Sequence, residues 1–314
     1  MVEQSAAAVA MIRPCCFYPN PETASDNAFQ TDLSEEKSAS VSRVAREEFD
    51  KTVCSLLGNG IRVHVFDDTA LPEKPDAIFP NNWFSTHHDG RVAIYPMYSV
   101  SRRNERRHEL IDELGKEYLV RELVDYTAYE ARRLYLEGTG SLVLDYVNRI
   151  AYVSLSKRSS AEVVTRFCGD FDYAPAMFES VGNDGRPIYH TNVMLCLGSE
   201  FALAGLELIP DPRVREIVCA RLKESGKNVI ELDRRQIAEF AGNALELRND
   251  SEKLLILSAR ALASLRRDQR GEIERYARLV PLVIPTIELA GGSARCMMAA
   301  IYLPARVKEH HGGE

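Results

Sequence analysis

The sequence lacks the features that define several large protein classes. Among its 314 residues, no apolar run reaches the roughly 18 residues that a membrane-spanning helix requires. The formal net charge is −7, which argues against a surface for nucleic acid or for an anionic membrane. The N-terminal stretch is rich in alanine but has no basic segment, so we expect no signal peptide.

Metal and cofactor motifs are missing as well. The seven cysteines are odd in number and include no CxxC pair, a pattern typical of free thiols in a reducing cytoplasm rather than of disulfides or a zinc site. No GxGxxG, GxxxxGK[ST] or HExxH motif is present. We therefore predict a cytoplasmic protein without metal or cofactor, whose partner is a small molecule and not nucleic acid or membrane. The oligomeric state stays open, a homo-oligomer included.

Helix and strand patterns alternate along the whole chain. Residues 38–57 place apolar side chains at helical spacing and stop at a Gly-Asn-Gly turn, and residues 61–66 alternate as a strand does. Helices of this kind begin near Ser38, Ser101, Ser160, Asp211 and Asp268. We predict an α/β fold in which residues 11–305 form a single catalytic domain. Residues 1–10 are predicted to be a flexible extension and residues 306–314 a tail.

Cys296 is the first candidate for chemistry. It follows Gly291 and Gly292, whose freedom to take positive φ lets a backbone approach a ligand closely, and it adjoins Arg295. An electropositive neighbour favours the thiolate, which is the nucleophilic form of cysteine. The alternative is a cysteine that is simply buried where a core strand begins.

Two upstream groups complete a candidate catalytic set. Glu137 lies between an apolar stretch and a glycine-rich turn, although an exposed glutamate at a strand end would show the same pattern. His190 and Asn192 are two residues apart in a predicted strand over residues 189–197, so their side chains should share a face. A histidine satisfied within the core is the alternative. Together with a cysteine, such residues can serve as nucleophile, acid–base group and orienting group.

Further polar residues suggest a binding site. Asn81 and Asn82 precede Trp83, the only tryptophan, and two amides beside a ring suit a polar ligand, although asparagines also favour turns. Arg102 or Arg103, at the start of a charged helix predicted over residues 98–116, could hold a carboxylate with its planar fork. The alternative for these arginines is a solvated helix face.

With these residues in view, the sequence resembles the pentein superfamily of guanidine-modifying enzymes, which includes amidinotransferases and arginine deiminases. Four segments carry the resemblance in order: FPNNWFSTH, LEGTG, YHTN and GGSARCM. The resemblance covers most of the chain and is closest to the citrulline-utilisation hydrolases. It implies a five-bladed, pseudo-symmetric α/β propeller with a central active-site channel. It also implies a catalytic cysteine, histidine and glutamate, matched here by Cys296, His190 and Glu137.

The sequence departs from the arginine deiminases where they hold the guanidinium cation with two aspartates. The matching positions here are Asn82, or else Asn81, and Asn192. Burying a cation without anions is costly, whereas amides can both donate to and accept from a neutral ureido group. We therefore expect hydrolysis of citrulline to ornithine, ammonia and carbon dioxide through a covalent intermediate on Cys296.

Other activities remain open at this point. Arginine dihydrolases of the superfamily resemble this chain in carrying asparagine there, so arginine could be converted to citrulline or ornithine. A substituted arginine or a small guanidine such as agmatine would also fit. An amidinotransferase would need a second amine site and exclusion of water. A non-catalytic binding protein of the same fold should have lost the three catalytic residues, all of which are present.

Overall fold

The structure is a computed structural model and describes residues 2–31 and 38–306. Its strands are β1 Ala8–Arg13, β2 Arg62–Asp67, β3 Phe84–Thr86, β4 Arg91–Ile94, β5 Glu122–Asp125, β6 Val143–Asp145, β7 Ile150–Ser154, β8 Ala174–Phe178, β9 Leu195–Leu197, β10 Phe201–Ala204, β11 Asn228–Glu231, β12 Leu245–Arg248, β13 Lys253–Ser258, β14 Arg278–Leu282 and β15 Ala299–Ala300. Its α-helices are α1 Ser38–Gly58, α2 His108–Glu117, α3 Gly138–Ser141, α4 Ala161–Phe171, α5 Pro212–Glu224, α6 Arg234–Ala238, α7 Ala259–Ser264 and α8 Arg267–Ile273. Short 3₁₀ turns are η2 Pro80–Asn82, η3 Ser101–Glu105, η4 Thr127–Arg132, η5 Thr191–Val193, η6 Leu206–Leu208 and η7 Ile287–Ala290.

The strands form five sheets of three strands each, all with one topology. Their orders are β15-β1-β2, β3-β4-β5, β6-β7-β8, β9-β10-β11 and β12-β13-β14. In each sheet the middle strand runs antiparallel to the strand named first and parallel to the strand named last. Five such sheets are consistent with five pseudo-repeats, and the predicted α/β class is confirmed.

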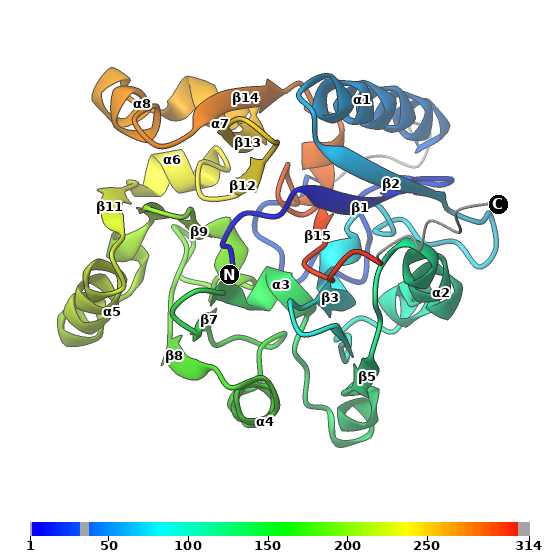
Figure 1. The fold of residues 1–314 in the computed structure, drawn as a ribbon, viewed down its shortest axis with the longest axis horizontal. Coiled ribbons are helices and arrows are strands. Elements are labelled where there is room, and N and C mark those ends of the chain that lie inside the picture. The colour runs from blue at the N-terminus through cyan, green and yellow to red at the C-terminus, as the bar shows by residue number, and fades with distance from the viewer. Residues whose placement is uncertain (1, 32–37, 307–314) are drawn as a thin grey trace, which may run out of the picture.

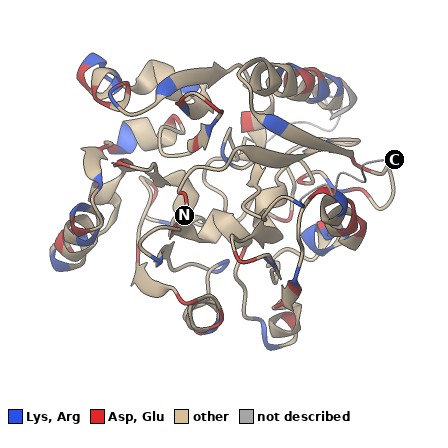
Figure 2. Cartoon of the chain, in the orientation of Figure 1, with Lys and Arg blue, Asp and Glu red and all other residues tan. Residues whose placement is uncertain are grey.

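Each parallel pair is joined through a helix, as the geometry of a parallel connection requires. In the third sheet, α4 links β7 to β8 and buries apolar residues spaced three and four apart, namely Val163, Val164, Phe167 and Phe171. The long helices lie at the periphery of the molecule and most strands lie nearer its centre (Figure 1). Lys, Arg, Asp and Glu gather mainly on these outer helices, with both signs mixed (Figure 2). Within the described ranges, no helix is long and apolar enough to cross a membrane.

The predicted helix over residues 98–116 is wrong in its middle. The structure has η3 and then α2, separated by Arg106 and Arg107, and the backbone of Arg106 is extended at φ −69° and ψ 117°. The Arg106 guanidinium donates to the Tyr95 carbonyl at 3.2 Å and pairs with Glu130. These tertiary contacts outweigh the local helical preference.

The N-terminal residues are not a flexible extension where the structure describes them. Gln4 is buried, and its side chain donates to the Leu144 carbonyl at 2.9 Å and accepts from the Tyr146 backbone N–H at 2.9 Å. β1 begins at Ala8 and is the middle strand of its sheet. The alanine-rich composition suggests a flexible extension, but this stretch continues the apolar pattern of β1 and is buried with it. Of the predicted tail, residues 307–314 lie outside the described part of the chain.

A short turn precedes the antiparallel first strand of every sheet. Chemistry-bearing residues fall in these turns: Asn81 and Asn82 before β3, Glu137 before β6, His190 and Asn192 before β9, Asn243 before β12 and Cys296 before β15. The strand predicted over residues 189–197 is shorter than expected, because β9 covers only its last three residues. His190 and Asn192 thus lie in and beside a 3₁₀ turn and do not share a strand face.

Candidate active site

The turns before three of the sheets bring predicted site residues into one small cavity. A small cavity of about 20 Å³ is lined by Asn82, His190 and Cys296 from these turns. Two charged groups that the sequence did not single out, Asp76 and Arg158, also line it, as does Arg102. Each of these six side chains is nine-tenths buried or more. Buried polar and charged side chains that converge in this way mark a candidate site for a small polar ligand.

His190 is held by the predicted glutamate. Its Nε2 lies 2.8 Å from Oε2 of Glu137, which is fully buried at the start of α3. Burial would raise the pKa of Glu137, but Arg158, His190 and Arg102 outweigh it and hold that pKa well below its ordinary value. An ionised carboxylate only accepts hydrogen bonds, so His190 donates through Nε2. This leaves Nδ1 of His190 as the atom that can exchange a proton.

The same burial affects the charge of the imidazole. Desolvation lowers the pKa of His190, while the carboxylate of Glu137 opposes that shift. The imidazole is therefore predominantly neutral at neutral pH and can be protonated transiently. A histidine poised in this way suits acid–base catalysis.

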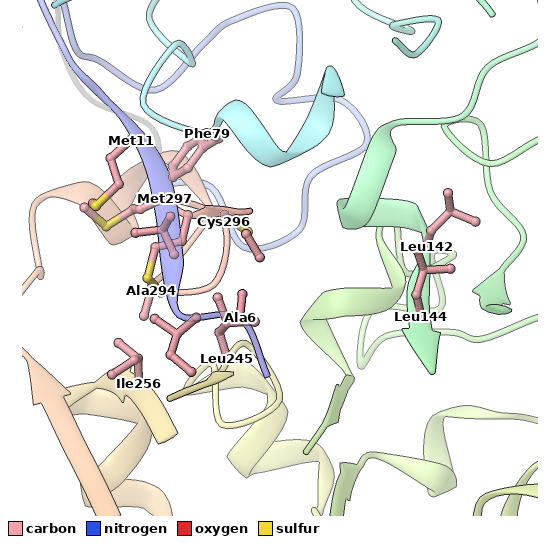
Figure 3. Close-up of a cluster of buried hydrophobic side chains, with 14 of the residues drawn as sticks. Ala6, Met11, Phe79, Leu142, Leu144, Leu245, Ile256, Ala294, Cys296 and Met297 are labelled. Atoms are coloured by element: carbon pink, nitrogen blue, oxygen red, sulfur yellow. The ribbon is translucent and has the colours of Figure 1, made fainter. Parts of the chain in front are cut away.

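Cys296 reaches the cavity from the turn before β15. It is 4% exposed and belongs to a hydrophobic cluster with Met11, Phe79 and Met297. Figure 3 shows these side chains gathered around β1. The predicted role of Arg295 is not seen, because its guanidinium donates to the Met298 carbonyl at 2.9 Å and lines a separate cavity. The sulfur instead has two amide neighbours: Asn192 Nδ2 at 3.5 Å and Asn243 Nδ2 at 3.3 Å.

Two arginines enter the cavity with their partners already in place. Arg102 donates from Nε and Nη2 to Glu105 at 2.8 and 2.9 Å, and from Nη1 to Oδ1 of Asn82 at 3.0 Å. Arg158 donates in the same bidentate way to Asp26, at 2.8 and 2.7 Å. Bidentate pairing fixes the orientation of a guanidinium. Of the two predicted arginines, Arg102 therefore lines the cavity.

Arg103, the other predicted arginine, points elsewhere. It is only partly buried, donates to the Met97 carbonyl at 3.2 Å and lies 3.2 Å from Glu130. A ligand in the cavity would meet its neighbour and not Arg103. The position of η3 decides between two residues that the sequence alone could not separate.

Asp76 adds an acid that sequence reasoning missed. Its Oδ2 accepts from Asn20 Nδ2 at 2.8 Å and lies 3.6 Å from Arg102 Nε. Burial raises the pKa of Asp76, with Arg102 and Asn20 opposing the shift. This carboxyl can receive an ammonium group.

Of the three predicted binding residues Asn81, Asn82 and Trp83, only Asn82 lines the cavity. Nδ2 of Asn82 is buried with no hydrogen-bond partner. Asn81 is buried outside the cavity lining, and both its side-chain polar atoms lack a partner. Trp83 is outside the cavity lining, is fully buried and packs on Phe84 with ring centroids 4.4 Å apart, so its role as a ligand-binding ring stays a prediction. Trp83 belongs to the same hydrophobic cluster as Phe84, the first residue of β3.

Gly140 lies close to the side chains of His190 and Asn82. A Cβ added there would lie 2.8 Å from His190 Nδ1 and would also collide with Nδ2 of Asn82. We expect Gly140→Ala to displace both groups and to lower kcat by about 10²-fold, as misplaced catalytic groups do. Steady-state kinetics test this. Gly169→Ala is the matched control, since its Cβ would meet nothing within 4 Å, and equal losses in both variants would contradict the expectation.

The family model for eukaryotic N,N-dimethylarginine dimethylhydrolase matches residues 13–303. The chain belongs to this family. The predicted pentein superfamily is thereby confirmed, together with the predicted class of enzyme, a C–N hydrolase. The narrower resemblance to citrulline hydrolases stays a prediction, and no curated protein matches the sequence.

Solved structures show the same fold at low identity. An asparagine-to-serine variant of the N-terminal domain of ArgZ, covalently bound to a reaction intermediate, has a TM-score of 0.74 at 16% identity and covers 95% of this chain and 98% of that chain. ArgZ is described as a cyanobacterial arginine dihydrolase. AgrE with L-arginine has a TM-score of 0.74 at 15% identity, over 96% of this chain and 41% of that one. A dimethylarginine dimethylaminohydrolase variant, as its adduct with S-methyl-L-thiocitrulline, has a TM-score of 0.62 at 16% identity, over 93% and 98%.

Proposed function

We propose that this protein hydrolyses the terminal ureido or guanidino group of an arginine-like amino acid, with citrulline as the best-matched substrate. The observation that carries the proposal is one buried cavity in which Cys296 and His190 face a shared space. No hydrogen bond joins the two among the described contacts, so neither side chain occupies the other. The proposal assigns catalysis to Cys296, His190 and Glu137.

The charged groups of the cavity suit the head group of an amino acid. The guanidinium groups of Arg102 and Arg158 each pair with a carboxylate through Nε and Nη2. Their remaining nitrogen, Nη1, lies near Oε2 of Glu137, at 3.7 Å for Arg102 and 3.5 Å for Arg158. A substrate carboxylate can accept from these fixed guanidinium groups. Asp76 can accept from the substrate ammonium. These three residues would orient the chain of the substrate toward the sulfur.

The surroundings of the sulfur favour a neutral reacting group. The side chains that hydrogen bond to Cys296 are the amides of Asn192 and Asn243, and Asn82 lines the same cavity. Glu137 is occupied by His190 and by the two arginines. A guanidinium cation gains less from amide surroundings than from carboxylates, whereas Nδ2 of Asn82, which has no hydrogen-bond partner, can donate to the carbonyl of a neutral ureido group.

The reaction then proceeds in two steps. The Cys296 thiolate attacks the ureido carbon in the minor fraction of the enzyme whose His190 has taken up a proton from solvent. His190 gives this Nδ1 proton to the departing nitrogen, which leaves as the amine of ornithine. A thiocarbamate remains on the sulfur. Neutral His190 next takes a proton from water, the hydroxide displaces the thiolate, and the released carbamate yields ammonia and carbon dioxide. Glu137 orients His190 throughout.

The comparisons favour a second candidate. The similar structures include proteins described as arginine dihydrolases, and the matching family is defined by N,N-dimethylarginine. Each of these substrates carries the same head group and a cationic guanidino group. Asp76 is the acid in the cavity lining that would offset such a cation.

Product analysis separates these candidates. Citrulline, arginine and N,N-dimethylarginine are supplied in separate reactions, and ornithine, citrulline and ammonia are followed over time. Ornithine from citrulline, with arginine and N,N-dimethylarginine inert, is the expected result. Citrulline accumulating from arginine would replace the proposal with a deiminase, and ornithine from both would indicate a dihydrolase. Release of dimethylamine would assign the reaction that names the family.

Substrate choice should respond to charge at Asn82. Asn82→Asp adds an anion to the cavity wall, so we expect the ratio of kcat/KM for arginine over citrulline to rise about tenfold or more. The same substitution at Asn59, which lies just beyond α1 and pairs with Arg278, is the matched control. A ratio that stays level or falls in Asn82→Asp would remove the electrostatic argument for citrulline.

The five sheets support a further part of the proposal. Their shared topology, with outer helices around inner strands in Figure 1, suits a five-bladed propeller whose central channel holds the site. A single catalytic domain over residues 11–305, a homo-oligomeric state and a cytoplasmic location stay predictions.

A further inference from the structure

Asn243 is a buried residue that none of the roles above requires. It occupies the turn before β12, which corresponds to the turns that carry Asn82, His190 and Cys296 in other modules. Its side chain is fully buried, yet it does not line the substrate cavity. Its contacts lead instead to the nucleophile.

The hydrogen bonds of Asn243 fix which end of its amide faces the sulfur. Oδ1 accepts from the Arg295 backbone N–H at 3.1 Å, and Nδ2 donates to the Asn192 backbone carbonyl at 3.1 Å. Reversing the amide would break both bonds, since a carbonyl cannot bond to an oxygen nor an N–H to an NH₂ donor. The second N–H of Nδ2 therefore points at Sγ of Cys296, 3.3 Å away. An N–H donor favours an anionic acceptor over a neutral thiol.

Asn192 approaches the same sulfur from the turn before β9. Its Nδ2 lies 3.5 Å from Sγ and its Oδ1 lies 4.0 Å away, so the donor is the nearer atom. Asn243 also binds the backbone of Asn192, which couples the two turns. Two amide donors from different modules thus converge on one sulfur.

The backbone just before Asn243 has an unusual conformation and packs closely on η5. Phe240 is buried and has φ +61°, a left-handed conformation that a non-glycine residue adopts only when its surroundings enforce it. Gly242 allows close packing, because a Cβ there would lie 2.5 Å from the Val193 carbonyl oxygen in η5. Strain and close approach at neighbouring positions place the amide where a relaxed loop would not.

We propose that Asn243 and Asn192 form a two-amide site that holds the sulfur of Cys296 as the thiolate and aims it at the substrate. This assignment rests on the proposed function in naming Cys296 the nucleophile. It gives Asn192 a role toward the sulfur in place of the substrate contact expected from the sequence. Asn243 is then a catalytic residue, since it touches a reacting atom.

Alkylation of Cys296 by iodoacetamide tests this without any substrate. The rate is followed by mass spectrometry of the Cys296 peptide between about pH 5 and pH 10 in the wild type and in Asn243→Ala. We expect the alkylation rate of the variant at pH 7 to fall about tenfold, with its midpoint moved upward by about one pH unit, because only the thiolate reacts. Asn243→Asp, which sets an oxygen against the sulfur, should shift the midpoint at least as far.

Other groups that titrate near the sulfur stay the same in these variants. Those that share its cavity are Asp76, Arg102, Arg158, Tyr189 and His190. Asn249→Ala is the matched control, because Asn249 also holds a turn through backbone hydrogen bonds but lies away from the sulfur. Its alkylation profile should equal that of the wild type.

The outcomes are distinct. A folded Asn243→Ala protein with an unchanged profile would make Asn243 only a loop tether and overturn the proposal. If that variant does not fold, Asn192→Ala removes the other amide that contacts the same sulfur. An unchanged pH dependence of Cys296 alkylation in Asn192→Ala would overturn the proposal equally. A shifted profile supports it even if the enzyme hydrolyses none of the tested substrates, in which case only the proposed function fails.

Discussion

Cys296→Ser should lower hydrolysis of the substrate by about 10⁴-fold or more while the protein stays folded. The serine hydroxyl fills nearly the same space and can accept from the same two amides, so the cluster around β1 loses little. An alcohol, however, is scarcely ionised at neutral pH and is a far weaker nucleophile than a thiolate. Losses of this size are typical when a covalent nucleophile is removed. Steady-state kinetics with circular dichroism measure both effects.

Cys168→Ser is the matched control for that result. Cys168 has the same 4% exposure as Cys296 but lies in α4, and burial raises the pKa of its thiol to about 11, so it is an inert structural cysteine. Its serine variant should keep the wild-type rate constant per folded molecule. A Cys296→Ser protein that turns over at the wild-type rate would assign the nucleophile elsewhere.

Glu137→Gln is expected to have the next largest effect, a fall in kcat of about 10³-fold. The carboxylate fixes the tautomer and orientation of His190 and raises its pKa against the effect of burial. Glutamine removes that support, so the pKa of His190 falls further. The limb of the kcat–pH profile that reports His190 should therefore move to lower pH in the variant.

Glu130→Gln provides the comparison for this variant. Glu130 also pairs with two arginines, Arg103 and Arg106, but it lies outside the cavity lining. It should lower the melting temperature without moving the pH profile. A Glu137→Gln profile whose limb stays in place or moves to higher pH would contradict the assignment of Glu137 as the partner of His190.

The fold follows from local patterns where the pattern is strong. α1 was predicted within a residue because its apolar spacing is regular and a glycine turn ends it. The region of η3 and α2 was predicted as one helix because its charged residues give no signal of the break. That break comes from Arg106, which reaches Tyr95 and Glu130 only after the chain has folded.

The site residues also fall into those that local sequence patterns suggest and those that only tertiary contacts place. Cys296, His190 and Glu137 could be proposed because glycines and apolar residues frame them in sequence. Arg158 could not, since it is placed by Asp26, which is 132 residues away. Asn243 had a signal that went unused: it precedes β12 as Asn82 precedes β3, so aligning the five modules with each other would have found it.

The pairing of β1 with both β2 and β15 has a consequence for synthesis of the protein. Val9 lies opposite Ala300, so β1 is made long before one of its two partner strands. While the ribosome is still elongating the chain, β1 and β2 present an open edge, and an open edge is a site for wrong pairing. Cys296 is made just before that partner strand. Cys296, the proposed nucleophile, therefore enters its amide and acid–base surroundings late, as the first sheet is completed.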